Sequence, residues 1–158
     1  MEKKPAENLS SSLEDYLEAI LMLYEKQGIA GVSDISAFLS VRKSSVTGAL
    51  RALADKGMVV HQRYGKVVLT KQGSRIAKDI EEKHRSLSKF FSSVLGVSPE
   101  IAAEDACKIE HTISPEGFDR LTKFLEFVKH PSKKKKPKWL EKFHCYCVSS
   151  KRNNKKQK

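Results

Sequence analysis

The chain has few of the features that mark exported or membrane-embedded proteins. Only three of its 158 residues are cysteines, Cys107, Cys145 and Cys147, an odd number that argues against a disulfide framework and for reduced thiols. No apolar run approaches the roughly 20 residues that a membrane helix needs, and residues 1–8 are polar, with no secretory signal behind them. These absences predict a cytoplasmic protein with no membrane partner.

The net charge of +11 is unevenly distributed along the chain. Residues 1–128 contain 18 basic and 18 acidic residues, so the whole excess lies from Lys129 onward, where 12 basic residues stand against Glu141 alone. Within the neutral part, residues 33–75 have a net charge of +6, whereas the segments on either side each have −3. A basic segment in an acidic frame is typical of a surface that faces nucleic-acid phosphates.

The N-terminal part has the pattern of a helix, a turn and a helix. Apolar residues recur at helical spacing behind an N-cap expected at Ser11, and this first helix should end near Gly28. A short second helix opens at Val32, and a third starts at Ser44 or Ser45, one of which should cap it. The β-prone runs that follow Gly57 then predict a hairpin.

The remainder of the chain is predicted to be helical. A long helix carries an apolar stripe from Ile76 to Leu95 and is closed by Gly96, and two further helices begin at Ser98-Pro99 and Ser114-Pro115. Their apolar faces exceed what one small chain buries, which favours a homodimer. The lysine-rich tail is expected to be flexible, except for a possible short helix at 138–145.

We therefore predict a mostly α fold: an N-terminal winged helix-turn-helix with a two-stranded wing, followed by a helical domain. The expected boundaries are 10–74 for the DNA-binding domain, 75–128 for the helical metal-binding and dimerisation domain, and 129–158 for the basic tail.

Metal-binding residue types are concentrated in one helical turn. Cys107, Glu110 and His111 stand at positions i, i+3 and i+4, so they share a helix face. A thiolate, a carboxylate and an imidazole together form a partial coordination sphere for a divalent transition metal. Random helices seldom place three such donors on one stripe, so this is the strongest chemical signal in the sequence.

Further donors lie outside this cluster. Asp15 and Glu18 are an i, i+3 carboxylate pair on the first helix, and His84 interrupts the apolar stripe of the long helix. Taken singly, exposed acids are usually only solvated, and a histidine on an apolar face is more often a hydrogen-bonded core residue. The coincidence of the three sets favours a shared metal site.

These segments resemble the metal-dependent repressors of the diphtheria toxin repressor and manganese transport regulator type (the DtxR/MntR family). The resemblance covers residues 12 to about 128 and rests on the segments 13–18 (LEDYLE), 32–35 (VSDI), 44–47 (SSVT), 69–73 (LTKQG), 83–85 (KHR) and 109–114 (IEHTIS). It implies a dimer in which metal switches on operator binding. The implied ligands are Asp15, Glu18, His84, Cys107, Glu110 and His111.

The resemblance is to two branches of that family at once. Asp15 and Glu18 are similar to the manganese-sensing branch, whereas Cys107 is similar to the iron-sensing branch. The other ancillary positions of the iron branch match Ser88 and Ala103, which are poor ligands. Because a thiolate makes the site softer, we expect Fe(II) as the cofactor, with Mn(II) second.

The partner implied is double-stranded operator DNA. We expect the third helix to enter the major groove and the wing to approach the backbone. The predicted contacts are Arg42, Lys43, Ser44, Ser45, Thr47 and Arg51 on the helix, with Tyr64 and Lys66 on the wing.

Two alternatives remain at this stage. One is a metal-independent winged-helix regulator that responds to a small ligand or to oxidation of Cys107. The other is a metalloenzyme built on the same donors, which is disfavoured because the sequence shows no nucleophile-base pair and no phosphate-binding loop. We expect no enzymatic activity.

Overall fold

The structure is a computed structural model that describes residues 9–61, 65–129 and 137–154. The chain forms two compact units, Met1–Glu82 and Lys83–Lys158, and the division falls inside helix α4 (Lys71–Lys89). Across the described residues, no helix has the length and apolar character needed to cross a bilayer.

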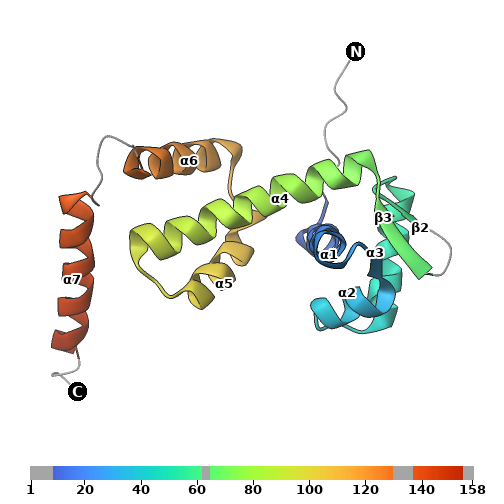
Figure 1. The fold of residues 1–158 in the computed structure, drawn as a ribbon, viewed down its shortest axis with the longest axis horizontal. Helices are drawn as coiled ribbons and strands as arrows, with labels where there is room; N and C mark the ends of the chain where they lie inside the picture. Colours follow the sequence, from blue (N-terminus) through green and yellow to red (C-terminus); the bar gives the residue numbers. More distant parts are fainter. Residues whose placement is uncertain (1–8, 62–64, 130–136, 155–158) are drawn as a thin grey trace, which may run out of the picture. The chain divides into compact units, whose positions relative to one another are not determined.

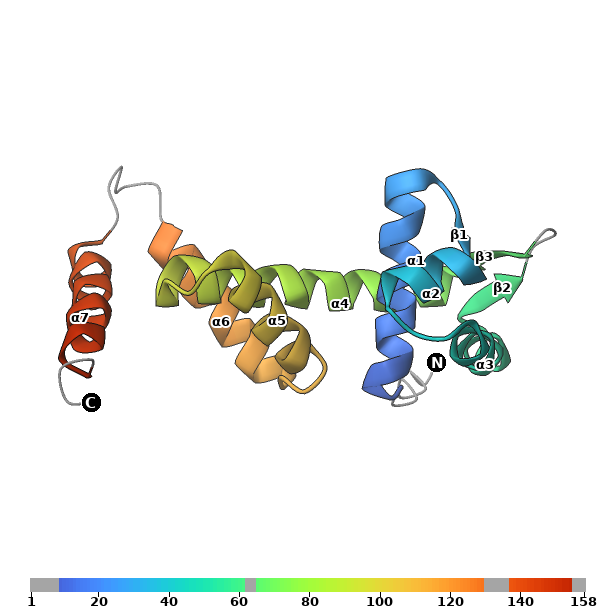
Figure 2. The same ribbon diagram turned by 90° about the horizontal axis from the view of Figure 1, so that it is seen from below.

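The first unit contains the predicted helix-turn-helix (Figures 1 and 2). Helix α1 (Ser11–Gln27) ends at Gly28, as predicted, because Gly28 takes a left-handed φ of 72° that a glycine adopts without strain. The N-cap of α1 is Ser10 rather than the predicted Ser11. The Leu13 amide donates to the Ser10 hydroxyl, which satisfies one of the unpaired amides of the first turn.

A tight turn joins the second and third helices of the first unit. Helix α2 (Val32–Phe38) is joined to α3 (Lys43–Asp55), which begins one or two residues before the predicted start at Ser44 or Ser45. The residue at the N-cap of α3 is Arg42, whose side chain makes no capping hydrogen bond. The prediction that Ser44 or Ser45 caps this helix is therefore wrong, because both lie inside its first turn.

A small antiparallel sheet forms the wing and completes the first unit. Strands β2 (Val59–His61) and β3 (Lys66–Leu69) form the expected hairpin. Among the described residues the sheet also has a third strand, β1 (Ala30–Gly31), giving the order β1-β3-β2. Its two residues pair with Val67 and Lys66, so the segment before α2 is hydrogen-bonded to the wing.

The core of the first unit joins α1, α2, α3, the sheet and the start of α4. Leu17 and Ile20 of α1 are fully buried, as are Leu50 and Leu53 of α3, which confirms the apolar stripe predicted for the third helix. Burying one such side chain contributes about 1.5–3 kcal/mol. With its apolar face held in this core, α3 has an opposite face that lies toward solvent.

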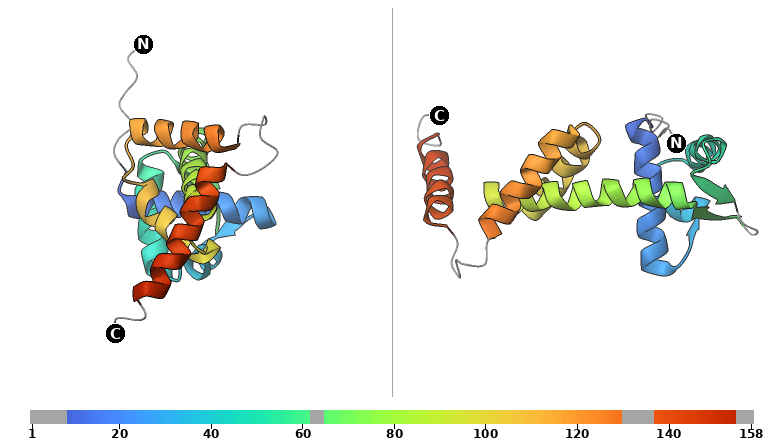
Figure 3. Two further views of the ribbon diagram at one scale, coloured as in Figure 1. Left: turned by 90° about the vertical axis from the view of Figure 1, so that its left-hand side faces the viewer. Right: turned by 90° about the horizontal axis from the view of Figure 1, so that it is seen from above.

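In the described residues of the second unit, all the regular secondary structure is helical (Figure 3). After Lys89, α4 continues as a π-helical segment, η2 (Phe90–Leu95), which ends at the predicted Gly96. Helix α5 (Pro99–Glu110) has the predicted Ser98 cap, and the amide of Gly117 donates to Ser114 at the start of α6 (Pro115–Lys129). The sequence did not predict the π-helical turn.

Helix α7 (Lys138–Asn154) is longer than the helix expected at 138–145. Leu140 is buried against Val94 and Leu125, and the rings of Trp139 and Phe124 lie 6.1 Å apart. His144 Nε2 lies 2.8 Å from the Val94 carbonyl oxygen, within hydrogen-bond distance. These contacts hold α7 against η2 and α6.

Candidate metal centre

Glu110 is the only buried charged residue among those the structure describes. It occupies the last turn of α5, and its side chain is 0% exposed. Ala106 and Ala102 lie one and two turns earlier on the same face and are also buried, so the spacing of four residues carries Glu110 into the interior. The two small alanines let this face pack closely and leave the carboxylate at its end.

The first imidazole beside this carboxylate is that of His84 on α4. Its Nδ1 atom lies 2.7 Å from Glu110 Oε2, and the histidine side chain is 30% exposed. A neutral ring that donates its Nδ1–H to Glu110 keeps Nε2 as a lone-pair donor. A carboxylate that fixes the tautomer and orientation of a histidine in this way is typical of metal sites.

The second imidazole belongs to His111, the C-cap of α5. Its Nε2 atom lies 3.2 Å from Glu110 Oε1, and its side chain is 8% exposed. Two donors bound to one ion at about 2.1 Å lie roughly 3.0–3.4 Å apart, depending on the bond angle. The separation of these two atoms therefore fits ligation of a common ion.

The two carboxylate oxygens of Glu110 differ in their surroundings, because Oε2 is hydrogen-bonded to His84 whereas Oε1 has no hydrogen-bond partner among the described residues. An ionised carboxylate in the interior costs several kcal/mol unless it is paired. A divalent cation beside Glu110, His84 and His111 would supply a compensating positive charge, and the oxygen and nitrogen donors would suit a first-row transition metal.

The other predicted ligands differ in their placement. Cys107 is exposed on α5, yet its sulfur lies within 4.8 Å of a Glu110 carboxylate oxygen. Asp15 and Glu18 lie one turn apart on α1 in the first unit, and both are half-buried. Within the second unit, the structure thus brings together His84, Cys107, Glu110 and His111.

The exposed face of α5 carries an ion pair between Lys108 and Glu104. Lys108 Nζ donates to Glu104 Oε1 at 2.7 Å, which lowers the pKa of Glu104 and raises that of Lys108. Both side chains are mostly exposed, so the pair contributes little to stability. Glu110 and the Lys108–Glu104 pair therefore lie on different sides of α5.

Ser88 is a polar residue of this region to which sequence analysis gave no role as a ligand. It lies one helical turn after His84 on α4, and its hydroxyl is buried with no hydrogen-bond partner among the described residues. The signal available in the sequence was the i, i+4 spacing from His84. A hydroxyl there is a weak neutral donor.

The predicted DNA-contacting side chains of α3 lie on its solvent face. The exposed set comprises Arg42, Lys43, Ser44, Ser45, Thr47 and Arg51. Thr47 also donates its hydroxyl to the Lys43 carbonyl oxygen at 2.9 Å, so part of its role is local. On the wing, Lys66 is exposed, whereas Tyr64 lies outside the described residues.

Comparison with known proteins matches two consecutive parts of the chain to two different domain families. Residues 8–67 match the family model "Iron dependent repressor, N-terminal DNA binding domain". Residues 70–139 match the model "Iron dependent repressor, metal binding and dimerisation domain". The buried donors lie within the second match, and α3 lies within the first.

Two relatives can be aligned with most of the chain. It is 35% identical over 122 residues to an uncharacterized HTH-type transcriptional regulator of Methanocaldococcus jannaschii, covering 77% of this chain and 98% of the relative. It is also 35% identical over 125 residues to the HTH-type transcriptional regulator MntR of Bacillus subtilis, covering 79% of this chain and 87% of that protein.

A solved structure supports the fold. The T. acidophilum IdeR crystal structure is 31% identical with a TM-score of 0.66, covering 76% of this chain and 55% of that chain. The present chain thus spans about half the length of that structure. Family models over both parts of the chain, and relatives matched over most of their length, show that this chain belongs to the iron-dependent repressor family.

Proposed function

We propose that this protein is a cytoplasmic, dimeric transcriptional repressor of metal-homeostasis genes that binds operator DNA when it holds a divalent metal. The observation that carries the proposal is a fully buried carboxylate, Glu110, flanked by the imidazoles of His84 and His111. Membership of the iron-dependent repressor family supplies the connection between such a site and DNA binding.

The ligand set that we propose is larger than this trio. His84 and His111 would contribute ring nitrogens, and Glu110 a carboxylate oxygen. We add Cys107, Asp15 and Glu18 on the chemistry of their donor atoms and their helical spacing. The carboxylates of Asp15 and Glu18 and the thiol of Cys107 would add further oxygen and sulfur donors.

The bound cation would supply positive charge that compensates the buried carboxylate. Residues of the chain itself position the donor atoms. Glu110 orients His84 through Nδ1, and the C-cap position holds the ring of His111 near Glu110 Oε1. Because imidazole and thiol ligands must lose protons to bind, metal affinity should fall as the medium becomes acidic.

We propose Fe(II) as the activating metal and Mn(II) as second choice. The imidazole nitrogens and the thiol of Cys107 make the donor set softer than an all-oxygen site. Both branches of the family are represented among the relatives: the B. subtilis relative is called MntR, and the T. acidophilum structure is called IdeR. The Cys107 thiol is the feature of this chain that favours iron.

DNA recognition is proposed to use the exposed face of α3. Ser44, Ser45 and Thr47 are small enough to let the helix approach base edges, while Arg51 and Lys43 reach bases or phosphates. Arg42, Lys66 and Tyr64 are proposed backbone contacts. In a dimer, the two copies of α3 would read two half-sites of the operator.

The test compares DNA binding with and without metal under anaerobic conditions. A duplex selected from random sequences by the Fe(II)-loaded protein serves as operator, and its affinity is measured with Fe(II), with Mn(II) and with a chelator. We expect a gain of about 5–150-fold with metal, the usual range for coupling between two sites. The Glu110→Gln variant should lose this gain, whereas Glu116→Gln, an exposed residue of α6, should keep it. Equal affinity with metal and with chelator would overturn the proposal.

A further inference from the structure

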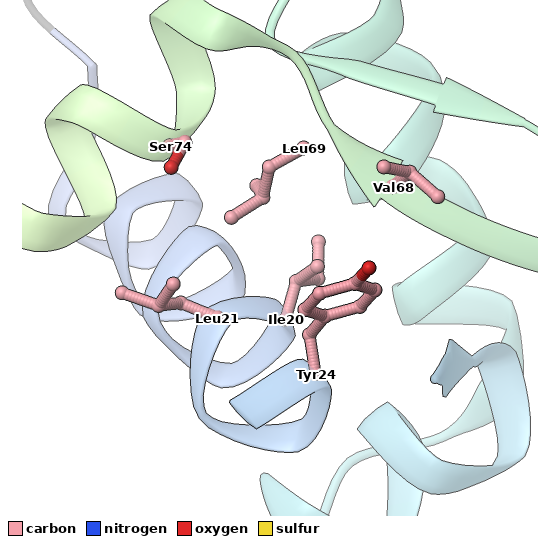
Figure 4. A pocket seen from close by; sticks show the side chains of 6 residues that line it. All are labelled: Ile20, Leu21, Tyr24, Val68, Leu69 and Ser74. Atoms are coloured by element: carbon pink, nitrogen blue, oxygen red, sulfur yellow. The ribbon is translucent and has the colours of Figure 1, made fainter. Parts of the chain in front are cut away.

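An apolar cavity of about 240 Å³ lies in the first unit, between α1, β3 and the start of α4. Its walls are Ile20, Leu21 and Tyr24 of α1, Val68 and Leu69 of β3, and Ser74 of α4. Figure 4 shows these side chains around the opening, with the Tyr24 hydroxyl directed toward Val68. A cavity of roughly 150 Å³ accepts benzene, so this one has room for a larger apolar body.

A second cavity of about 190 Å³ adjoins the first at Tyr24 and Val68. Its other walls are residues 28–30 and the first residues of β3, including Lys66. Because side chains alternate along a strand, Lys66 and Val68 lie on the same face of β3. The ammonium group of Lys66 is therefore carried on the side of the strand where Val68 meets Tyr24.

The two cavities together have the chemistry of an amphipathic site. Four of the six residues that line the first are aliphatic, and two of these, Ile20 and Leu21, are buried. The second carries a cation, Lys66, and no acidic side chain of the described residues lines it. An apolar pocket beside a second pocket that carries a positive charge fits a ligand with an apolar body and one negative group.

We propose that this cleft binds a small monocarboxylate with an apolar body of about eight carbons. The hydrocarbon part occupies the cavity between Leu21, Leu69 and Ser74. The carboxylate faces Lys66, and Tyr24 lies between the two parts as the wall they share. The metal site does not take part, since every wall of the cleft belongs to residues 20–74.

The location suggests how such a ligand acts on DNA binding. Lys66 is one of the phosphate contacts in the proposed function, and this regulatory step rests on that proposal. A carboxylate beside Lys66 neutralises its charge, so a phosphate contact is lost and the slope of log affinity against log salt becomes shallower by about 1. The monocarboxylate is therefore an antagonist of operator binding.

Binding is tested directly with sodium octanoate as the probe and 1-octanol as the neutral analogue of equal chain length. The full chain is titrated without metal or DNA, while the methyl NMR signals of Ile20, Val68 and Leu69 are followed. We expect saturable shifts with octanoate and binding about fivefold weaker with octanol, the size of effect that a partly exposed ion pair gives. Lys66→Gln should remove this difference, and the exposed Lys71→Gln should preserve it.

Three results would overturn the proposal: no saturable shifts at these methyl groups, equal affinity for octanoate and octanol, or an octanoate preference that survives Lys66→Gln. Ser74→Phe provides a separate check, because its ring fills the apolar cavity and should abolish binding of both probes. Since no metal or DNA is present, failure here leaves the metal-dependent function untouched. Failure of the metal test likewise leaves this cleft in place.

Discussion

Gly73, in the first turn of α4, lies directly against the backbone carbonyl of Met58, so that a Cβ at position 73 would overlap the carbonyl oxygen. The neighbouring Thr70 joins the same two segments, because its amide donates to the Met58 oxygen at 2.9 Å and its hydroxyl accepts from the Gly73 amide. The wing and the start of α4 are thus packed backbone against backbone.

Gly73→Ala is expected to destabilise the protein. The overlap is with backbone, which cannot move aside as a side chain can, so the free energy of unfolding should fall by about 3 kcal/mol, at the upper end for overpacking. Urea denaturation followed by circular dichroism measures the change. Gly48→Ala is the matched control: nothing lies within 4 Å of its added Cβ, and in a helix alanine should gain about 1 kcal/mol. Equal effects of the two substitutions would contradict the packing argument.

Ser40→Gly is expected to stabilise the first unit. Ser40 lies in the turn before α3 and has a φ of 55°, the only positive φ of a non-glycine residue among those described. Glycine adopts this conformation without the cost to an L side chain, and its greater freedom when unfolded offsets part of that gain. We expect a net rise of about 0.5–1 kcal/mol in the free energy of unfolding. A lower melting temperature for Ser40→Gly would refute this account of the turn.

Ser98→Ala tests the start of α5 and the acidity of Glu100. The pKa of Glu100 lies below its usual value because the carboxylate accepts from its own amide and from the Ser98 hydroxyl. Loss of the cap should cost about 1 kcal/mol, and the pKa of Glu100 should rise toward its ordinary value. The lowered pKa adds stability above the ordinary pKa of the group, and this part is lost as the pH falls through the folded value. Carboxyl NMR titration of both proteins gives the result, and an unchanged pKa would exclude Ser98 as a cause.

The helices of this protein could be predicted where the sequence marks their ends. Gly28 and Gly96 close helices with positive φ, and Ser98-Pro99 opens α5, because these residues have few other favourable conformations. The cap of α1 shifted from Ser11 to Ser10 because adjacent serines offer the same hydroxyl. Arg42 at the N-cap of α3 could not be foreseen, since two better capping residues follow it.

Other features depend on contacts that a single sequence does not encode locally. Strand β1 has only two residues and is defined by its pairing with β3, so no alternating pattern in the sequence predicts it. The π-helical segment from Phe90 keeps an apolar pattern compatible with an α-helix. In the candidate metal site, spacing predicted that Glu110 and His111 lie together. It did not predict that Glu110 is buried while Cys107, on the preceding turn, is exposed.

Metal removal should lower thermal stability. A metal that binds only the folded state stabilises it by about 2.7 kcal/mol at 100 times its dissociation constant, which corresponds to roughly 5–10 °C in melting temperature. We therefore expect Fe(II) or Mn(II) to raise the melting temperature of the wild type, and a chelator to reverse the change. His111→Gln should reduce the shift sharply, while His144→Gln, which alters the α7 contact, should retain it. A shift of the same size in both variants would remove His111 from the site.

The most direct test of the central claim is the affinity for metal measured with and without operator DNA. If metal promotes DNA binding, linkage requires that DNA raise the affinity for metal by the same factor. Competition with a fluorescent chelator, run under anaerobic conditions with and without saturating operator duplex, gives both constants. The account predicts tighter metal binding in the presence of operator, by the factor found for DNA affinity, and loss of this effect in Glu110→Gln. Identical metal affinity with and without DNA would contradict metal-controlled repression.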